Sequence, residues 1–97
     1  MSLEYELSEL ALRDLESIWN YSAEQWSVKQ ANIYYELIFD VINSICQNPE
    51  IGKSIREVKL DHSSKLAKLH MILYKIDKGK ILVDRILNQR MDIEKMY

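Results

Sequence analysis

The chain has 97 residues, 47% of them hydrophobic, with two glycines, one proline and a formal net charge of −2. This length suits a single domain over residues 1–97, and the composition excludes intrinsic disorder. The charge is unevenly divided, because residues 1–52 carry two basic and nine acidic side chains (−7) and residues 53–97 carry eleven basic and six acidic ones (+5). The basic half indicates nucleic acid or an acidic protein segment as a partner, or lysines that only solvate the edge of a sheet.

Neither a membrane span nor a signal peptide is indicated. No apolar run approaches the roughly 18 residues that a span needs, and the N-terminal residues lack the basic and apolar regions of a signal peptide. The single cysteine, Cys46, has no internal disulfide partner, which fits a reducing compartment. We therefore expect a cytoplasmic protein.

The first half of the chain predicts a strand followed by two helices. Residues 3–7 alternate apolar and acidic side chains, as in a strand with one wet face. Ser8 suits an N-cap, and apolar residues at helical spacing predict an amphipathic helix over residues 9–25. Ser27 opens a capping box, and the stripe that follows predicts a second helix up to the Asn48-Pro49 pair. The short break between them indicates an antiparallel helical hairpin.

The second half of the chain predicts strands. Apolar residues separated by charged ones suggest a short irregular strand over residues 55–60, which residues 62–64 then break. Residues 69–92 read as two strands around an Asp-Lys-Gly turn, apolar on both faces as in the centre of a sheet. We therefore expect an α+β fold of order β-α-α-β-β-β, with the helical hairpin packed on one face of a mainly antiparallel four-stranded sheet.

The residue types that carry catalysis are sparse. Two histidines eight residues apart and one distant cysteine do not match the spacing of common metal ligands, so we expect no metal and no cofactor. The sequence contains neither a Gly-rich phosphate loop nor a nucleophile elbow. Ser63, His70 and Asp84 are the residue types of a hydrolytic triad, but these types co-occur by chance in most chains.

The remaining candidate site is a set of basic side chains on or beside the last two strands: Lys65, Lys68, Lys75, Arg85 and Arg90. Such a set can stabilise phosphate charge during RNA cleavage, or it can anchor acidic side chains or phosphates without chemistry. Arg85 lies inside an apolar strand, where a charge is costly unless it is paired. We favour a structural ion pair for Arg85, with a carboxylate such as Asp92 or one from a partner, over a phosphate-facing role.

Several motifs occur in order across almost the whole chain. They are Leu7-Ser8-x-x-Ala11-x-x-Asp14-Leu15-x-x-Ile18, Tyr21, Trp26, Gln30-Ala31-x-x-Tyr34, Asn48-Pro49-x-Ile51-Gly52, His70-x-Ile72-x-Tyr74 and Arg85-Ile86-Leu87-x-x-x-Met91-Asp92. In this order and spacing they resemble the ParE-type toxins of bacterial type II toxin–antitoxin modules, within the RelE/ParE superfamily that includes plasmid stabilisation proteins.

The resemblance implies a RelE/ParE-like fold and a small toxin that a ParD-like antitoxin neutralises. It implies a non-catalytic inhibitor that binds DNA gyrase. The RelE-like alternative is a ribosome-dependent mRNA endonuclease, for which Lys65, Lys68, Arg85 and Tyr97 supply the residue types. The side chains expected to bind the target or the antitoxin are Lys65, Lys68, His70, Lys75, Arg85 and Arg90.

The chain departs from the ParE-like pattern at three places. It has His62-Ser63 where a Tyr-Arg pair is usual, it lacks the glycine usual near Lys68, and it has Asn88 in place of a histidine after Arg-Ile-Leu. A further hypothesis is therefore a degenerate module that binds an antitoxin without being toxic.

Overall fold

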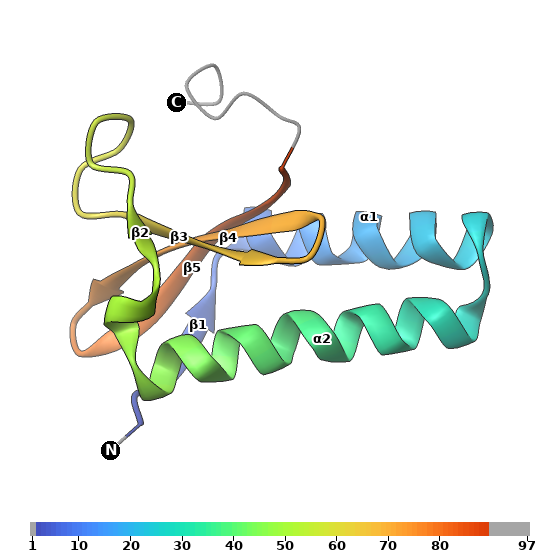
Figure 1. The fold of residues 1–97 in the computed structure, drawn as a ribbon, viewed down its shortest axis with the longest axis horizontal. Helices are drawn as coiled ribbons and strands as arrows, with labels where there is room; N and C mark the ends of the chain where they lie inside the picture. Colours follow the sequence, from blue (N-terminus) through green and yellow to red (C-terminus); the bar gives the residue numbers. More distant parts are fainter. Residues whose placement is uncertain (1, 90–97) are drawn as a thin grey trace.

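The computed structural model describes residues 2–89 as two long helices packed on one face of a five-stranded sheet (Figure 1). The elements are β1 (Tyr5–Leu7), α1 (Glu9–Gln25), α2 (Val28–Gln47), the 3-10 turn η1 (Pro49–Ile51), β2 (Lys53–Ser54), β3 (Ser63–Ala67), β4 (His70–Asp77) and β5 (Lys80–Asn88). The strand order is β1-β5-β4-β3-β2, and all described pairings except the parallel pair β1–β5 are antiparallel. The expected α+β class and helical hairpin are confirmed.

Both helices begin at the serine caps that the sequence predicts. The Ser8 hydroxyl accepts a hydrogen bond from the Ala11 N–H at 3.0 Å, and the Ser27 hydroxyl accepts one from the Gln30 N–H at 3.0 Å. Each cap satisfies a first-turn N–H that has no partner within its helix. The predicted limits of the first helix, residues 9–25, are therefore confirmed.

The hairpin of β4 and β5 forms the centre of the sheet, as its two apolar faces predict. Lys78 and Gly79 connect the strands with φ values of +52° and +78°. Two consecutive positive φ angles are typical of the type I′ turns that match the twist of antiparallel strands. Glycine at the second position adopts this conformation without strain.

The predicted strand over residues 55–60 is wrong, as is the break at residues 62–64. The N–H groups of Val58 and Lys59 both donate to the Ile55 carbonyl, at 2.8 and 2.9 Å, so this segment turns back on itself. The polar run Ser63–Ala67 forms β3 instead, because it pairs with β4 over five residues. With the two-residue edge strand β2, the sheet has five strands and not four.

The main core lies between the helices and the sheet, and its largest buried side chain is that of Tyr74. The Tyr74 hydroxyl donates to the Pro49 carbonyl at 2.6 Å and accepts from the Gly52 N–H at 3.0 Å, which fixes the chain where it leaves α2. A Cβ at position 52 would meet that hydroxyl and lie 2.8 Å from the ring. Gly52 is therefore required for the close approach of Tyr74, although its φ is ordinary.

A smaller apolar cluster lies on the other face of the sheet, where Ile55 packs with Leu73, Leu87 and Met71. The segment that replaces the predicted strand thus covers part of the face that the helices leave open. Within residues 2–89, no helix is both long and apolar enough to cross a membrane.

Candidate functional site

A groove opens between the helical hairpin and one end of the sheet. Figure 1 shows that the end of the helical hairpin where α1 connects to α2 projects well past the β3–β4 turn, so the sheet covers only part of the helices. The groove has a volume of about 640 Å³. Its walls include Ile18, Tyr21, Trp26, Tyr34, Lys68 and His70. This combination of an apolar hollow and a few convergent polar groups is typical of a binding site.

The floor of the groove is organised by the hydroxyl of Tyr34. This oxygen lies 3.1 Å from the Ala67 carbonyl, 3.1 Å from the Leu69 N–H and 2.6 Å from Nδ1 of His70. Because the hydroxyl donates to the carbonyl and accepts from the N–H, its third contact is satisfied when Nδ1 of His70 carries the proton. The three contacts join α2 to the β3–β4 turn.

Burial keeps the two titratable groups of this floor uncharged. Desolvation lowers the pKa of His70 below its ordinary value of 6.5, although the negative charge of Asp14 opposes the shift. Desolvation also raises the pKa of Tyr34 above 10.0, against the smaller opposite effect of the Leu69 N–H. At neutral pH the floor therefore offers hydrogen-bonding groups without charge.

Lys68 supplies the positive charge of the groove from a strained backbone position. It is the first residue of the two-residue turn between β3 and β4, and its φ is +53°. This left-handed region favours glycine, so a lysine there costs about 1 kcal/mol or more. Strain of this kind is often retained where a side chain has a binding role.

The rim of the groove is aromatic and open to solvent. Tyr21 is 60% exposed and Trp26 is 64% exposed, and their rings meet edge to face with centroids 6.3 Å apart. Exposed aromatic rings beside a hollow are the side chains that most often dominate the energy of a protein–protein interface. The rim is therefore suited to an apolar anchor from a partner.

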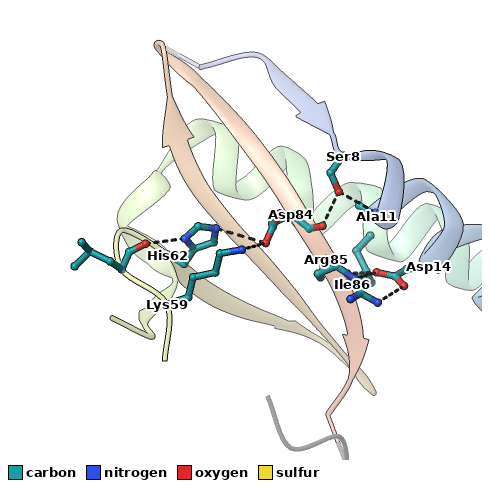
Figure 2. Close-up of polar contacts among 9 residues, drawn as sticks. Ser8, Ala11, Asp14, Lys59, His62, Asp84, Arg85 and Ile86 are labelled. Atoms are coloured by element: carbon teal, nitrogen blue, oxygen red, sulfur yellow. Dashed lines mark hydrogen bonds and ion pairs between the residues drawn. The ribbon is translucent and has the colours of Figure 1, made fainter. Parts of the chain in front are cut away.

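Arg85 does not line this groove, because it is held by a carboxylate of α1 (Figure 2). Its Nε and Nη2 donate to the two carboxylate oxygens of Asp14, at 2.9 and 3.0 Å, and the Ile86 N–H donates to Asp14 Oδ2 at 2.9 Å. Beside it, the Ser8 hydroxyl donates to the Asp84 carbonyl at 2.6 Å. The side chains of Ser8 and Asp14 thus bond to backbone groups of β5 beyond the point where β1 ends.

A second polar cluster lies on the opposite face of β5, at the residue that precedes Arg85. Lys59 Nζ donates to Asp84 Oδ2 at 2.8 Å, and Nε2 of His62 lies 3.6 Å from the same oxygen (Figure 2). His62 is 95% buried, and its Nδ1 donates to the Leu60 carbonyl at 2.9 Å. Asp84 therefore contacts His62, whereas His70 bonds Tyr34 in the groove. Of the hydrolytic triad considered above, the aspartate and the histidine thus lie in separate clusters.

The structure brings together only part of the set of side chains expected to bind the target or the antitoxin. Lys68 and His70 line the groove, whereas Lys65 lies on β3 opposite Ile72 and Lys75 lies on β4 opposite Leu82. Arg90, Tyr97 and Asp92 lie outside the described residues. Asn88, which stands where ParE-like sequences usually have a histidine, lines the groove with Lys68.

Sequence reasoning missed the aromatic rim and the partner of Arg85. The sequence signal for the rim was the position of Tyr21. It lies one helical turn after Ser17, which also lines the groove, and outside the buried stripe of α1. Nothing in the sequence alone distinguishes Asp14 from the other carboxylates as the partner of Arg85. Within residues 2–89, no group of three His, Cys, Asp or Glu side chains is arranged to hold a metal ion.

Comparisons with known proteins place this fold and sequence in one family. Residues 5–93 match the family described as the ParE toxin of the type II toxin–antitoxin system parDE. Toxin ParE1 of Mycobacterium tuberculosis is 34% identical over 96 residues, which cover 98% of each chain. Toxin ParE1 of Caulobacter vibrioides is 28% identical over 88 residues, which cover 91% of each chain.

Solved structures share the fold at low sequence identity. A chain of the chromosomal ParDE TA system from P. aeruginosa superposes with a TM-score of 0.77 at 12% identity, covering 90% of this chain and 96% of that one. A chain of the toxin–antitoxin complex RelBE2 from Mycobacterium tuberculosis superposes with a TM-score of 0.67 at 17% identity, covering 92% of this chain and all of the other. From the family match and the identity to curated relatives, the chain belongs to the ParE toxin family of type II toxin–antitoxin systems.

Proposed function

We propose that this ParE-type toxin inhibits DNA gyrase by binding and without catalysis, and that a ParD-like antitoxin neutralises it by laying an acidic, apolar segment in the groove. The observation that carries the proposal is the make-up of the groove. It combines an aromatic rim, one lysine and an uncharged floor. These are features of a surface that binds a protein segment.

The contacts of two candidate catalytic residues support binding over chemistry. The nuclease alternative needs Arg85 to face a phosphate, but its guanidinium is engaged by Asp14 through two hydrogen bonds. His70, the histidine of the groove, bonds the Tyr34 hydroxyl and has a lowered pKa. Neither side chain is arranged to act on a phosphodiester.

Charge supports an antitoxin contact at the groove. Among residues 2–89, Lys68 is the charged side chain in the wall, and the second half of the chain has an excess of basic residues. The structural relatives include chains of the ParDE TA system and of the RelBE2 toxin–antitoxin complex. An acidic residue beside an apolar anchor would pair with Lys68 and fill the rim, so the affinity should fall as salt screens the pair.

A supercoiling assay with purified protein tests the target. Inhibition of gyrase at micromolar toxin, relieved by the antitoxin, is expected. Undiminished supercoiling together with codon-linked mRNA cleavage in a translating extract, lost in Lys68→Ala and Arg85→Ala, would instead establish the RelE-like nuclease. No effect in either assay, with tight antitoxin binding and no growth arrest on expression, would establish the degenerate binding module.

Titration of antitoxin into toxin variants tests the groove. Trp26→Ala removes half of the exposed aromatic rim and should weaken binding by at least about tenfold. Ile33→Ala is the matched control, because Ile33 is 50% exposed on α2 but does not line the groove. Equal affinity of the two variants would place the antitoxin elsewhere.

A further inference from the structure

A second apolar surface lies on the other side of the helical hairpin. We call it the outer hairpin surface and define it by Leu12 and Trp19 of α1, Tyr35 and Phe39 of α2, and Tyr5 of β1. Leu12, Trp19 and Tyr35 line a hollow of about 270 Å³ between the helices. Leu12 is 53% exposed and Tyr35 is 39% exposed, so the hollow has accessible apolar walls.

The aromatic rings of this surface are contiguous. The Tyr35 and Phe39 centroids lie 4.9 Å apart, and the Phe39 and Tyr5 centroids lie 6.1 Å apart. The Trp19 indole is oriented by a 2.9 Å hydrogen bond from its Nε1 to Oδ1 of Asn32. The surface therefore extends from the hollow across α2 to the edge strand β1.

The outer hairpin surface is separate from the groove. Leu12 lines the hollow and Tyr21 lines the groove, nine residues further along the same helix. At about 100° per residue, nine residues place the two side chains on opposite sides of α1. A partner in the groove would therefore leave the outer hairpin surface accessible.

Carboxylates surround this surface. Glu16 lines the hollow, and Glu36 and Asp40 follow Tyr35 and Phe39 directly on α2. Glu36 and Asp40 are four residues apart, a spacing at which like charges destabilise a helix by about 0.2–0.5 kcal/mol. Among residues 2–89 these three carboxylates form no ion pair. They are free to attract a basic partner.

We propose that the outer hairpin surface docks an arginine-containing amphipathic segment of a partner protein, at the same time as the groove holds a different segment. Leu12 and Tyr35 accept its apolar side chains. Guanidinium groups stack on tyrosine and phenylalanine faces and bond carboxylates through two parallel hydrogen bonds, so arginine suits this surface better than lysine. The same negative field repels nucleic acid and anionic membranes. This surface lies outside the basic half and goes beyond the proposed function.

A peptide titration tests the inference without gyrase or antitoxin. The probe is a synthetic peptide with arginine and leucine at helical spacing, and the signal is the emission of Trp19 in a Trp26→Phe protein. The double variant Glu36→Lys/Asp40→Lys should bind at least about tenfold more weakly, because like charges then face each other. The single variant Glu36→Lys should also weaken binding, and Glu57→Lys is its charge-matched control, since Glu57 is exposed in the β2–β3 loop and forms no ion pair among residues 2–89.

Three results would overturn the proposal. They are an unchanged Trp19 emission up to millimolar peptide, equal binding of a peptide with glutamate in place of arginine, and equal weakening by Glu57→Lys. A peptide with lysine in place of arginine should bind more weakly, and affinity should fall between low and physiological salt. Thermal unfolding of each variant excludes misfolding as the cause of a lost signal.

Discussion

Removing the Asp14 carboxylate should cost a large part of the stability of this domain. In Asp14→Ala, two charge-assisted hydrogen bonds to Arg85 and one from the Ile86 N–H are lost. The Asp14 and Arg85 side chains are only 16% and 19% exposed, so the arginine stays in a largely desolvated position without this carboxylate. A charged hydrogen bond contributes about 1.5–3 kcal/mol, and because the three share one carboxylate we expect a loss of about 3 kcal/mol.

Thermal unfolding followed by circular dichroism measures this loss. For a domain of this size, about 3 kcal/mol lowers Tm by roughly 12–24 °C. A double-mutant cycle with Arg85→Met separates the pair from the individual side chains, and we expect a coupling energy of about 1–3 kcal/mol. A loss below about 0.5 kcal/mol, or additive effects in the cycle, would refute the reasoning and reopen a phosphate-facing role for Arg85.

Three further predictions concern the turns and the groove. Gly52→Ala should destabilise the domain by about 2–4 kcal/mol, because the new Cβ displaces the Tyr74 ring and its two hydrogen bonds; an unchanged urea midpoint would contradict this. Lys68→Gly should relieve the positive φ and stabilise by about 0.5–1 kcal/mol, yet weaken antitoxin binding because the charge is lost; urea unfolding and calorimetric titration measure the two effects. The pKa of His70 is lowered in the folded protein, so below pH 6.5 the unfolded chain binds more protons than the folded one. As the pH is lowered through this range, the free energy of unfolding should therefore decrease more steeply than in His70→Gln. Parallel pH profiles of the unfolding free energy in the two proteins would argue against this.

Local signals account for the elements that sequence reasoning predicted correctly. Ser8 and Ser27 define the helix starts because a cap bonds only to residues two or three positions along the chain. The β4–β5 hairpin follows likewise from Lys78-Gly79 between two apolar runs. These features need no knowledge of the rest of the fold.

The errors arose where tertiary contacts override local pattern. Ile55 has the apolar character of a strand residue, but it is buried against Leu73 and Leu87 on the outer face of the sheet while its backbone turns. The polar residues of β3 form a strand because β4 offers a partner. Strand propensity depends mainly on such pairing, so a serine-rich segment can form a strand when its neighbour is well placed.

The groove could be predicted only in part. The sequence marks Lys68 and His70 as candidates, but it does not show that Tyr34 bonds His70 and the two neighbours of Lys68 across a separation of more than thirty residues. Nor does the sequence show that the helical hairpin extends beyond the sheet, since that depends on the angle at which the helices cross the strands. The aromatic rim follows from this arrangement and not from any motif.

The parallel pairing of β1 with β5 has a consequence for how the toxin is made. Tyr5 pairs with Ile81, and the Ser8 hydroxyl bonds a carbonyl 76 residues further along the chain. Loops this long close slowly, because their entropy is lost before the contacts form. During synthesis the sheet therefore cannot close until almost all of the described chain has been translated. We expect fragments that end before β5 to be unfolded, so an interrupted translation product would be harmless to the cell that made it.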